Sequence, residues 1–334
     1  MLKEIKYPAL NAKMKGMYVN NFNGEELNDL MSQTDIKNVI SLLKTKFPSL
    51  ELLTDNMGRK EIEQELYNIF IFDIIKIFKY LTPSDQKIVM QYISRYELTC
   101  IKNVFRNIYT ERDSKTNLKN INNWTENIFK NIDGINEVNK TEDFVEIIKN
   151  EEYFKIFKEY VKDFENIPLE DLEVELDKYY FKRVYTLAQR TNKELLSMIG
   201  QEIDLLNFIW IYRSKHYFNY SKEMINSIII PKMYKLTKKN INDLIDAESY
   251  DDMLAILKTT IYKKVFDDEK DLEHSKDVYL YKQYRTLFRT KLFNICTVFC
   301  MINLIDVEIK NLINVIEGVR YGISEQEIQK RMIS

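Results

Sequence analysis

The sequence predicts an almost wholly α-helical protein, and three observations lead to that fold class. Only 7 of the 334 residues are Gly and 5 are Pro, whereas strand-rich folds need turn residues every ~8–12 positions. Apolar residues recur with helical spacing, and helix-capping sequences stand beside them. A pattern of one acidic and one small polar residue also occurs three times at nearly even spacing, which indicates a helical unit used three times.

Two helix starts and one helix end follow from local sequence. Thr82 to Asp85 (TPSD) provides an N-cap residue, a proline at the first helical position and an acid at the third. Ser324 to Glu327 has the spacing of a capping box and predicts the start of the last helix. Gly318 follows a long periodic stretch, where we expect it to end the helix as its C′ residue.

A single apolar stripe runs through the stretch before Gly318. Steps of four and three residues separate its members, which are Val298, Ile302, Ile305, Ile309, Leu312 and Ile316. This spacing predicts one continuous buried face along a helix of about five turns.

In each copy of the repeated pattern, an acid precedes a small polar residue, which we call the anchor, by three positions in an apolar stretch. The pairs are Glu97 and Cys100, Asp204 and Asn207, and Glu308 and Asn311. The two members share one helix face, and a carboxylate buried there must be paired. We interpret the pairs as structural repeat anchors that hydrogen-bond a neighbouring helix, and a partner-binding surface is the alternative.

Two polar stretches, Thr110–Asn123 and His216–Lys222, separate the copies. They divide the chain into three helical repeat units, which we place at residues 1–115, 116–218 and 219–334. Each unit also contains an acid–Leu element ahead of its anchor. These elements are Glu65–Leu66, Glu175–Leu176 and, in inverted order, Leu272–Glu273.

Two arginines, Arg106 and Arg213, each stand six residues after an anchor, near the expected helix C-terminus. A cation there interacts favourably with the helix dipole. The alternative is that both face a central cavity and contact an acidic partner, which makes them candidate partner-contact residues. The third copy has Glu317 at the corresponding position.

The composition excludes several classes of function. With 49 basic and 51 acidic residues, the net charge is −2, so there is no basic excess for nucleic-acid binding. The three cysteines, Cys100, Cys296 and Cys300, lie in apolar helical sequence and are expected to be buried thiols of a reduced compartment. The two histidines lie far apart, and no glycine-rich phosphate loop occurs. We therefore predict no catalytic, cofactor-binding or metal site.

No membrane-spanning or targeting segment is predicted. The N-terminus lacks the continuous apolar core of a signal peptide. The longest apolar run, from Phe293 to Ile305, is interrupted by Asn and falls short of the ~20 residues needed to cross a bilayer.

Several short motifs, in the right order along the chain, resemble one known family. Residues 302–332 contain an acid–x–Glu–Ile–x–Asn–Leu helix, a Gly, a second Gly and a short final helix. The matching positions elsewhere are Glu175, Leu176, Asp177 and Tyr180, then Asp204, Asn207 and Arg213, and then Ile230–Pro231, Leu236 and the helix from Asn240. Together they resemble the C-subunit family of V-type (archaeal-type) ATP synthases, whose eukaryotic member is the d subunit of vacuolar ATPases. The first unit departs most, with Cys100 in place of Asn and a basic run reduced to Lys13 and Lys15.

The resemblance implies an all-helical protein whose three pseudo-threefold-related subdomains form a funnel or truncated cone. It implies a non-catalytic central-stalk rotor subunit on the cytoplasmic face of the membrane. The implied partners are the D and F type proteins of the central stalk and the membrane proteolipid rotor ring. The ring moves protons or sodium ions while the family member transmits torque.

Two other functions are alternatives to this one. An unrelated α-helical scaffold would bind a peptide or helix in a groove and would lack internal threefold similarity. An enzyme that uses buried carboxylates would have a deep acidic pocket with perturbed pKa values.

Overall fold

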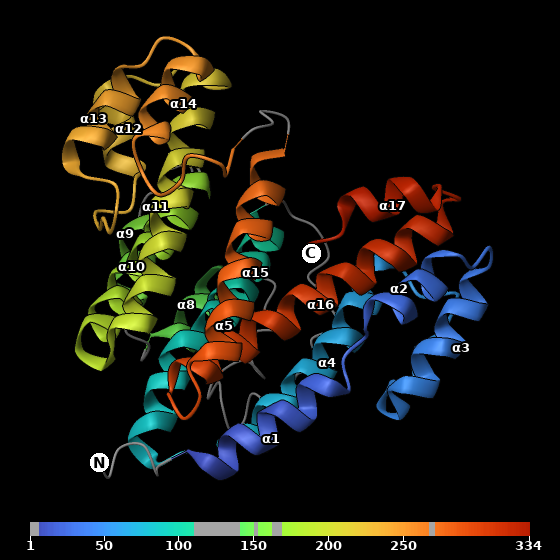
Figure 1. Ribbon diagram of the computed structural model, residues 1–334. Helices are drawn as coiled ribbons and strands as arrows, with labels where there is room; N and C mark the ends of the chain where they lie inside the picture. Colours follow the sequence, from blue (N-terminus) through green and yellow to red (C-terminus); the bar gives the residue numbers. More distant parts are fainter. Residues whose placement is uncertain (1–6, 110–140, 150–152, 162–168, 267–270) are drawn as a thin grey trace. The chain divides into compact units, whose positions relative to one another are not determined.

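The computed structural model describes residues 7–109, 141–149, 153–161, 169–266 and 271–334, and within these ranges the regular elements are all helical (Figure 1). The α-helices are α1 (Pro8–Val19), α2 (Gly24–Met31), α3 (Ile36–Lys46), α4 (Arg59–Phe78), α5 (Pro83–Tyr109), α8 (Thr141–Ile148), α9 (Phe154–Val161), α10 (Leu169–Thr191), α11 (Lys193–His216), α12 (Lys222–Ile228), α13 (Lys238–Asp246), α14 (Tyr250–Lys258), α15 (Leu272–Thr290), α16 (Cys296–Arg320) and α17 (Glu325–Arg331). The predicted all-α class is confirmed.

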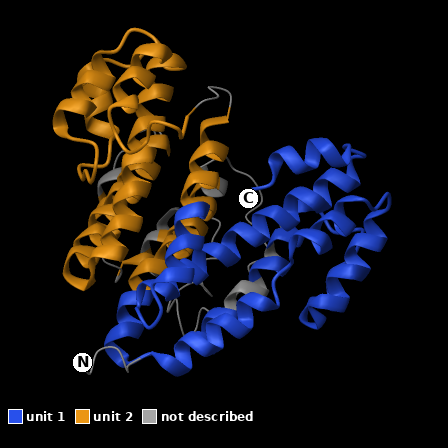
Figure 2. Cartoon of the chain, viewed as in Figure 1, with its two compact units in different colours: residues 1–89, 281–334 blue, residues 90–280 orange. Residues whose placement is uncertain are grey.

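The chain forms two compact units (Figure 2). Unit 1 comprises residues 1–89 and 281–334, and unit 2 comprises residues 90–280. Both boundaries fall inside long helices, α5 and α15. Along the described sequence, two short helices precede two long ones three times, in α2–α5, α8–α11 and α13–α16. The division into repeat units 1–115, 116–218 and 219–334 stays a prediction.

Helix α16 is the centre of unit 1, where it contacts α1, α2, α3, α4 and α17. All six residues of the predicted apolar stripe are buried, with at most 4% of any of them exposed. The stripe prediction is therefore confirmed. Neighbouring positions such as Phe299, Cys300 and Met301 are buried as well, because helices pack around α16 on several sides.

Both predicted helix starts are confirmed, since α5 begins at Pro83 and α17 at Glu325 with Ser324 as its N-cap. The predicted helix end at Gly318 is wrong. Helix α16 continues to Arg320, and the residue with positive φ is Gly322, at 64°. Gly318 instead allows close packing, because a Cβ built there would lie 2.5 Å from Cγ1 of Ile328 in α17. Sequence spacing alone does not distinguish these two roles of glycine.

Helix α11 is the centre of unit 2, where it contacts α10, α12 and α13. Its residues from Met198 to Leu205 are buried. Gly200 lies in this stretch, and a Cβ built on it would lie 2.5 Å from both Cβ and Cγ of Tyr234. The segment that contains Tyr234 therefore packs directly on the α11 backbone.

We predict that Gly200→Ala destabilises the protein by about 1–3 kcal/mol, because the new methyl group meets the immobile Cβ of Tyr234. Gly16→Ala is the matched control, since Gly16 lies in α1 and a Cβ built on it would have open space around it. At that position the higher helix propensity of Ala should stabilise the protein by up to about 1 kcal/mol. Thermal melting of both variants tests this, and equal shifts in Tm would contradict the packing role of Gly200.

Candidate functional site in two polar clusters

The second and third anchors hold irregular backbone on the two central helices. In unit 2, Asn207 of α11 donates from Nδ2 to the Ile230 carbonyl (3.0 Å) and accepts from the Ile230 N–H at Oδ1 (2.8 Å). In unit 1, Asn311 of α16 makes the same pair of bonds to Ile333, at 3.0 and 2.9 Å. Both asparagines are buried. Each one therefore satisfies the two backbone groups of one buried isoleucine.

Asp204, one turn before Asn207 on α11, binds the backbone of residues 234–236, which follow Ile230 in the same loop. Its carboxylate is fully buried. It accepts hydrogen bonds from the backbone N–H groups of Tyr234 (3.0 Å), Lys235 (2.6 Å) and Leu236 (2.9 Å), and from the hydroxyl of Tyr262 (2.8 Å). Burial raises the pKa of Asp204, and these four bonds oppose that rise because they favour the charged form.

Glu308 has a corresponding contact in unit 1, where its Oε1 accepts from the Phe22 N–H at 2.7 Å. Phe22 directly precedes Asn23, the N-cap of α2, just as Leu236 directly precedes Thr237, the N-cap of α13. In both units the acid thus holds the residue before a capped short helix. Burial raises the pKa of Glu308 to about 8.

The first acid and anchor make different contacts. Glu97 accepts a hydrogen bond from the Tyr153 hydroxyl at 2.9 Å. Cys100 is only partly exposed, and burial raises the pKa of its thiol to about 12. A thiol has no paired amide donor and carbonyl acceptor, so it cannot replace the asparagine. The other two cysteines, Cys296 and Cys300, are buried. The equivalence of the three anchors remains a prediction, which the matching contacts of Asn207 and Asn311 support.

The candidate partner contacts, Arg106 and Arg213, lie in the last turns of α5 and α11. Arg106 forms an ion pair with Glu173, and Arg213 with Glu273 at 2.7 Å. About half of each arginine side chain is exposed, 49% and 50%. Both therefore lie at helix C-termini, as the dipole interpretation expects, and both remain accessible from solvent.

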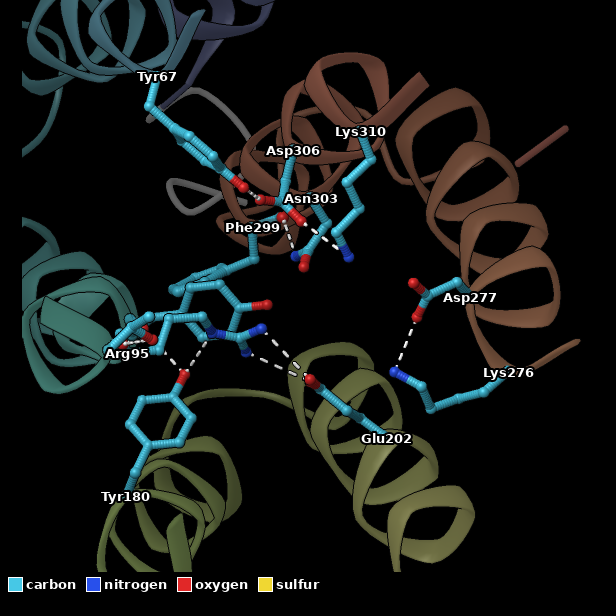
Figure 3. A network of polar contacts seen from close by, with 12 residues as sticks. Tyr67, Arg95, Tyr180, Glu202, Lys276, Asp277, Phe299, Asn303, Asp306 and Lys310 are labelled. Carbon is cyan, nitrogen blue, oxygen red and sulfur yellow. Dashed lines mark hydrogen bonds and ion pairs between the residues drawn. The ribbon is translucent and has the colours of Figure 1, made fainter. Parts of the chain in front are cut away.

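The structure shows a largely buried ion pair that the sequence did not reveal. In unit 2, the Arg95 guanidinium binds both carboxylate oxygens of Glu202, at 3.2 and 3.3 Å, and donates from Nε to the Tyr180 hydroxyl at 2.9 Å (Figure 3). Tyr180 in turn donates to the Tyr92 carbonyl at 2.8 Å. This cluster joins α5, α10 and α11, and removal of one charge would leave the other unpaired at a largely buried position.

A second cluster lies in unit 1, also drawn in Figure 3. The Tyr67 hydroxyl donates to Asp306 Oδ1 at 3.0 Å, and Lys310 lies 3.4 Å from Asp306 Oδ2. A sequence signal for both clusters exists, because Arg95, Glu202 and Asp306 each stand five residues before an anchor. Their charges differ in sign, so these positions do not read as copies of one motif.

The described residues also define two surface hollows. In unit 1, a hollow of about 880 Å³ is charge-balanced, since its lining includes three lysines (Lys13, Lys46, Lys76) and three acids (Glu26, Asp29, Asp73). In unit 2, a hollow of about 700 Å³ has a basic lining. Within the described ranges, no three or more His, Cys, Asp or Glu side chains are grouped to hold a metal ion. None of the helices in these ranges has the length and apolar character of a membrane span.

These features define a helical protein whose buried polar residues hold its own backbone. The family model described as "ATP synthase (C/AC39) subunit" matches residues 10–331, and the chain belongs to this family. It is similar to the C subunit of an A-type ATP synthase from Methanocaldococcus jannaschii, at 21% identity over 98% of this chain and 86% of that protein. It is also similar to the C subunit of an A-type ATP synthase from Methanosphaera stadtmanae, at 25% identity over 60% of this chain and 56% of that protein.

We predict that Asn207→Ala destabilises the protein by about 3 kcal/mol, because the N–H and carbonyl of Ile230 lose their partner while still buried. Asn226→Ala is the control, since Asn226 is exposed on α12 and bonds only within its own helix. Its effect should stay within about 0.5 kcal/mol. Denaturant titration measures both, and a loss at Asn207 no larger than at Asn226 would contradict the anchoring role.

The raised pKa of Glu308 predicts that the stability of the protein depends on pH. Its native pKa of about 8 lies above the ordinary value of about 4.3 for an unfolded chain. Between these values the native state binds a proton that the unfolded state does not, so the free energy of unfolding falls as pH rises.

Glu308→Gln should remove this contribution, so the variant should gain Tm over the wild type as pH increases from 5 to 8. Glu51→Gln, at an exposed position, is the control and should follow the wild-type curve. Parallel curves for Glu308→Gln and the wild type would show that the Glu308 carboxyl does not titrate in this range.

Proposed function

We propose that this chain is a non-catalytic central-stalk rotor subunit of a V-type ATPase or ATP synthase. It couples the central stalk, formed by D and F type proteins, to the membrane proteolipid rotor ring, and it transmits torque for proton or sodium transport. It acts as a peripheral protein on the cytoplasmic face of the membrane, and its subdomains form a pseudo-threefold funnel.

The match of one family model to residues 10–331 carries this proposal, together with relatives named as the C subunit of A-type ATP synthases. The recurring order of two short and two long helices supports the pseudo-threefold funnel. An element that transmits torque must resist deformation. The buried bonds of Asn207 and Asn311 suit this demand, because they attach loops to the central helix of each unit.

In this proposal, Arg106 and Arg213 contact acidic groups of the stalk. Half of each side chain is exposed, and exposed ion pairs contribute only about 0–1 kcal/mol. Each arginine can therefore leave its ion pair with Glu173 or Glu273 and pair with a carboxylate of the partner at little cost in free energy.

The purified chain should bind both the D and F type stalk proteins and the detergent-solubilised rotor ring of the same organism, in one complex that elutes together in size-exclusion chromatography. Binding to neither would overturn the rotor function. The Arg106→Ala, Arg213→Ala double variant should bind the stalk about five- to tenfold more weakly. Arg289→Ala is the matched control, because Arg289 also lies exposed in the last turn of a helix, α15. An equal loss in the control would exclude specific stalk contacts.

A further inference from the structure

A basic groove runs along one face of α10 in unit 2. We call this hollow of about 700 Å³ the cationic groove. Its lining residues come from α5, α9 and α10, and they are Gln91, Ile156, Glu175, Tyr179, Lys182, Arg183, Thr186, Leu187 and Arg190. Three of them are cations and one is an acid, whereas the whole chain carries a net charge of −2. The groove is therefore a local concentration of positive charge.

Two of the three cations in the groove are available to a ligand. Lys182 and Arg190 are exposed, and neither forms an ion pair within the described part of the chain. The one lining acid, Glu175, is already paired with Lys178 on the next turn of α10. Arg183 donates to the Tyr179 hydroxyl at 2.9 Å, which orients its guanidinium within the groove. The positive charges of Lys182 and Arg190 therefore attract an anionic group.

The length of the groove favours a chain molecule over a small anion. Its α10 residues lie on successive turns of one helix face from Glu175 to Arg190, and this face spans about 22 Å at 1.5 Å per residue. Lys182 and Arg190 lie about 12 Å apart along the helix axis by the same rise. One phosphate group cannot reach both cations, whereas carboxylates spaced along a peptide can. Ile156 and Leu187 add apolar surface for side chains between those carboxylates.

We propose that the cationic groove binds an acidic segment of a partner protein, with Lys182 and Arg190 as its two contact charges. This inference rests on the proposed function, because it places the segment on another component of the ATP synthase. It differs from the proposed roles of Arg106 and Arg213, which already have acidic partners in this chain.

A photo-reactive p-benzoylphenylalanine at Thr186 in the intact complex tests the occupant, and mass spectrometry identifies the cross-linked peptide. The control probe replaces Lys239, which is exposed on α13 outside the groove. We expect the Thr186 probe to capture an acidic segment of one ATP synthase component that the Lys239 probe does not capture. Capture of a neutral or basic segment, of lipid, or of nothing would overturn the proposal.

Charge reversal tests the two contact cations. Lys182→Glu with Arg190→Glu should lower the cross-linking yield at Thr186 by about tenfold and make the remaining yield less sensitive to salt. Lys238→Glu with Lys239→Glu changes the net charge equally outside the groove and should leave the yield unchanged. An equal loss in both double variants would contradict a specific contact.

The outcomes also separate this inference from the proposed function. Capture of an acidic segment from a protein outside the ATP synthase, abolished by the groove charge reversal alone, would support the groove and contradict the rotor function. Binding to stalk and ring without a cross-link at Thr186 would support the rotor function and overturn the groove.

Discussion

The attachment of irregular backbone to two buried helices governs how both units of this protein pack. Segments that leave a helix and pack against a core carry N–H and carbonyl groups that water cannot reach, and each unsatisfied group costs about 1–3 kcal/mol. Asn207 and Asn311 satisfy such groups on Ile230 and Ile333. Asp204 satisfies three more N–H groups. Polar side chains on otherwise apolar helices are therefore what permits the loops to pack closely on α11 and α16.

The two units reach this arrangement with different connectivity. In unit 2, the segment held by the acid follows the central helix in sequence, since Leu236 comes after Asp204. In unit 1, the segment held by the acid lies near the N-terminus and the central helix near the C-terminus, since the Phe22 N–H binds Glu308. Packing units therefore need not coincide with consecutive stretches of sequence. For this reason the compact units combine residues 1–89 with 281–334, although the repeated pattern divides the chain into consecutive thirds.

Charged residues have separate roles in the interior and at the surface. Arg95 binds Glu202 and the Tyr180 hydroxyl in a largely buried cluster, which holds three helices together. Arg106 and Arg213 are half exposed, and each forms an ion pair. Lys182 and Arg190 are exposed in the cationic groove, whose one acid, Glu175, is paired with Lys178. The first group contributes to the fold, whereas the other two lie at the surface, where the proposed partner contacts would form. A surface of this kind agrees with a protein that works inside a larger assembly.

Local sequence was sufficient to predict the helical class, the starts of α5 and α17, the buried stripe of α16 and the family. Each of these depends on residue spacing or on motif order, which the sequence displays directly. The role of Gly318 in close packing became clear only in three dimensions, because it depends on Ile328 in a neighbouring helix. The positive φ of Gly322 after α16 also became clear only in the folded backbone. The partners of Asp204, Glu308 and Arg95, and the cationic groove, likewise depend on contacts between distant segments. The physical reason is that hydrogen-bond partners and local charge depend on which helices lie side by side, and the spacing of residues within one helix does not contain that information.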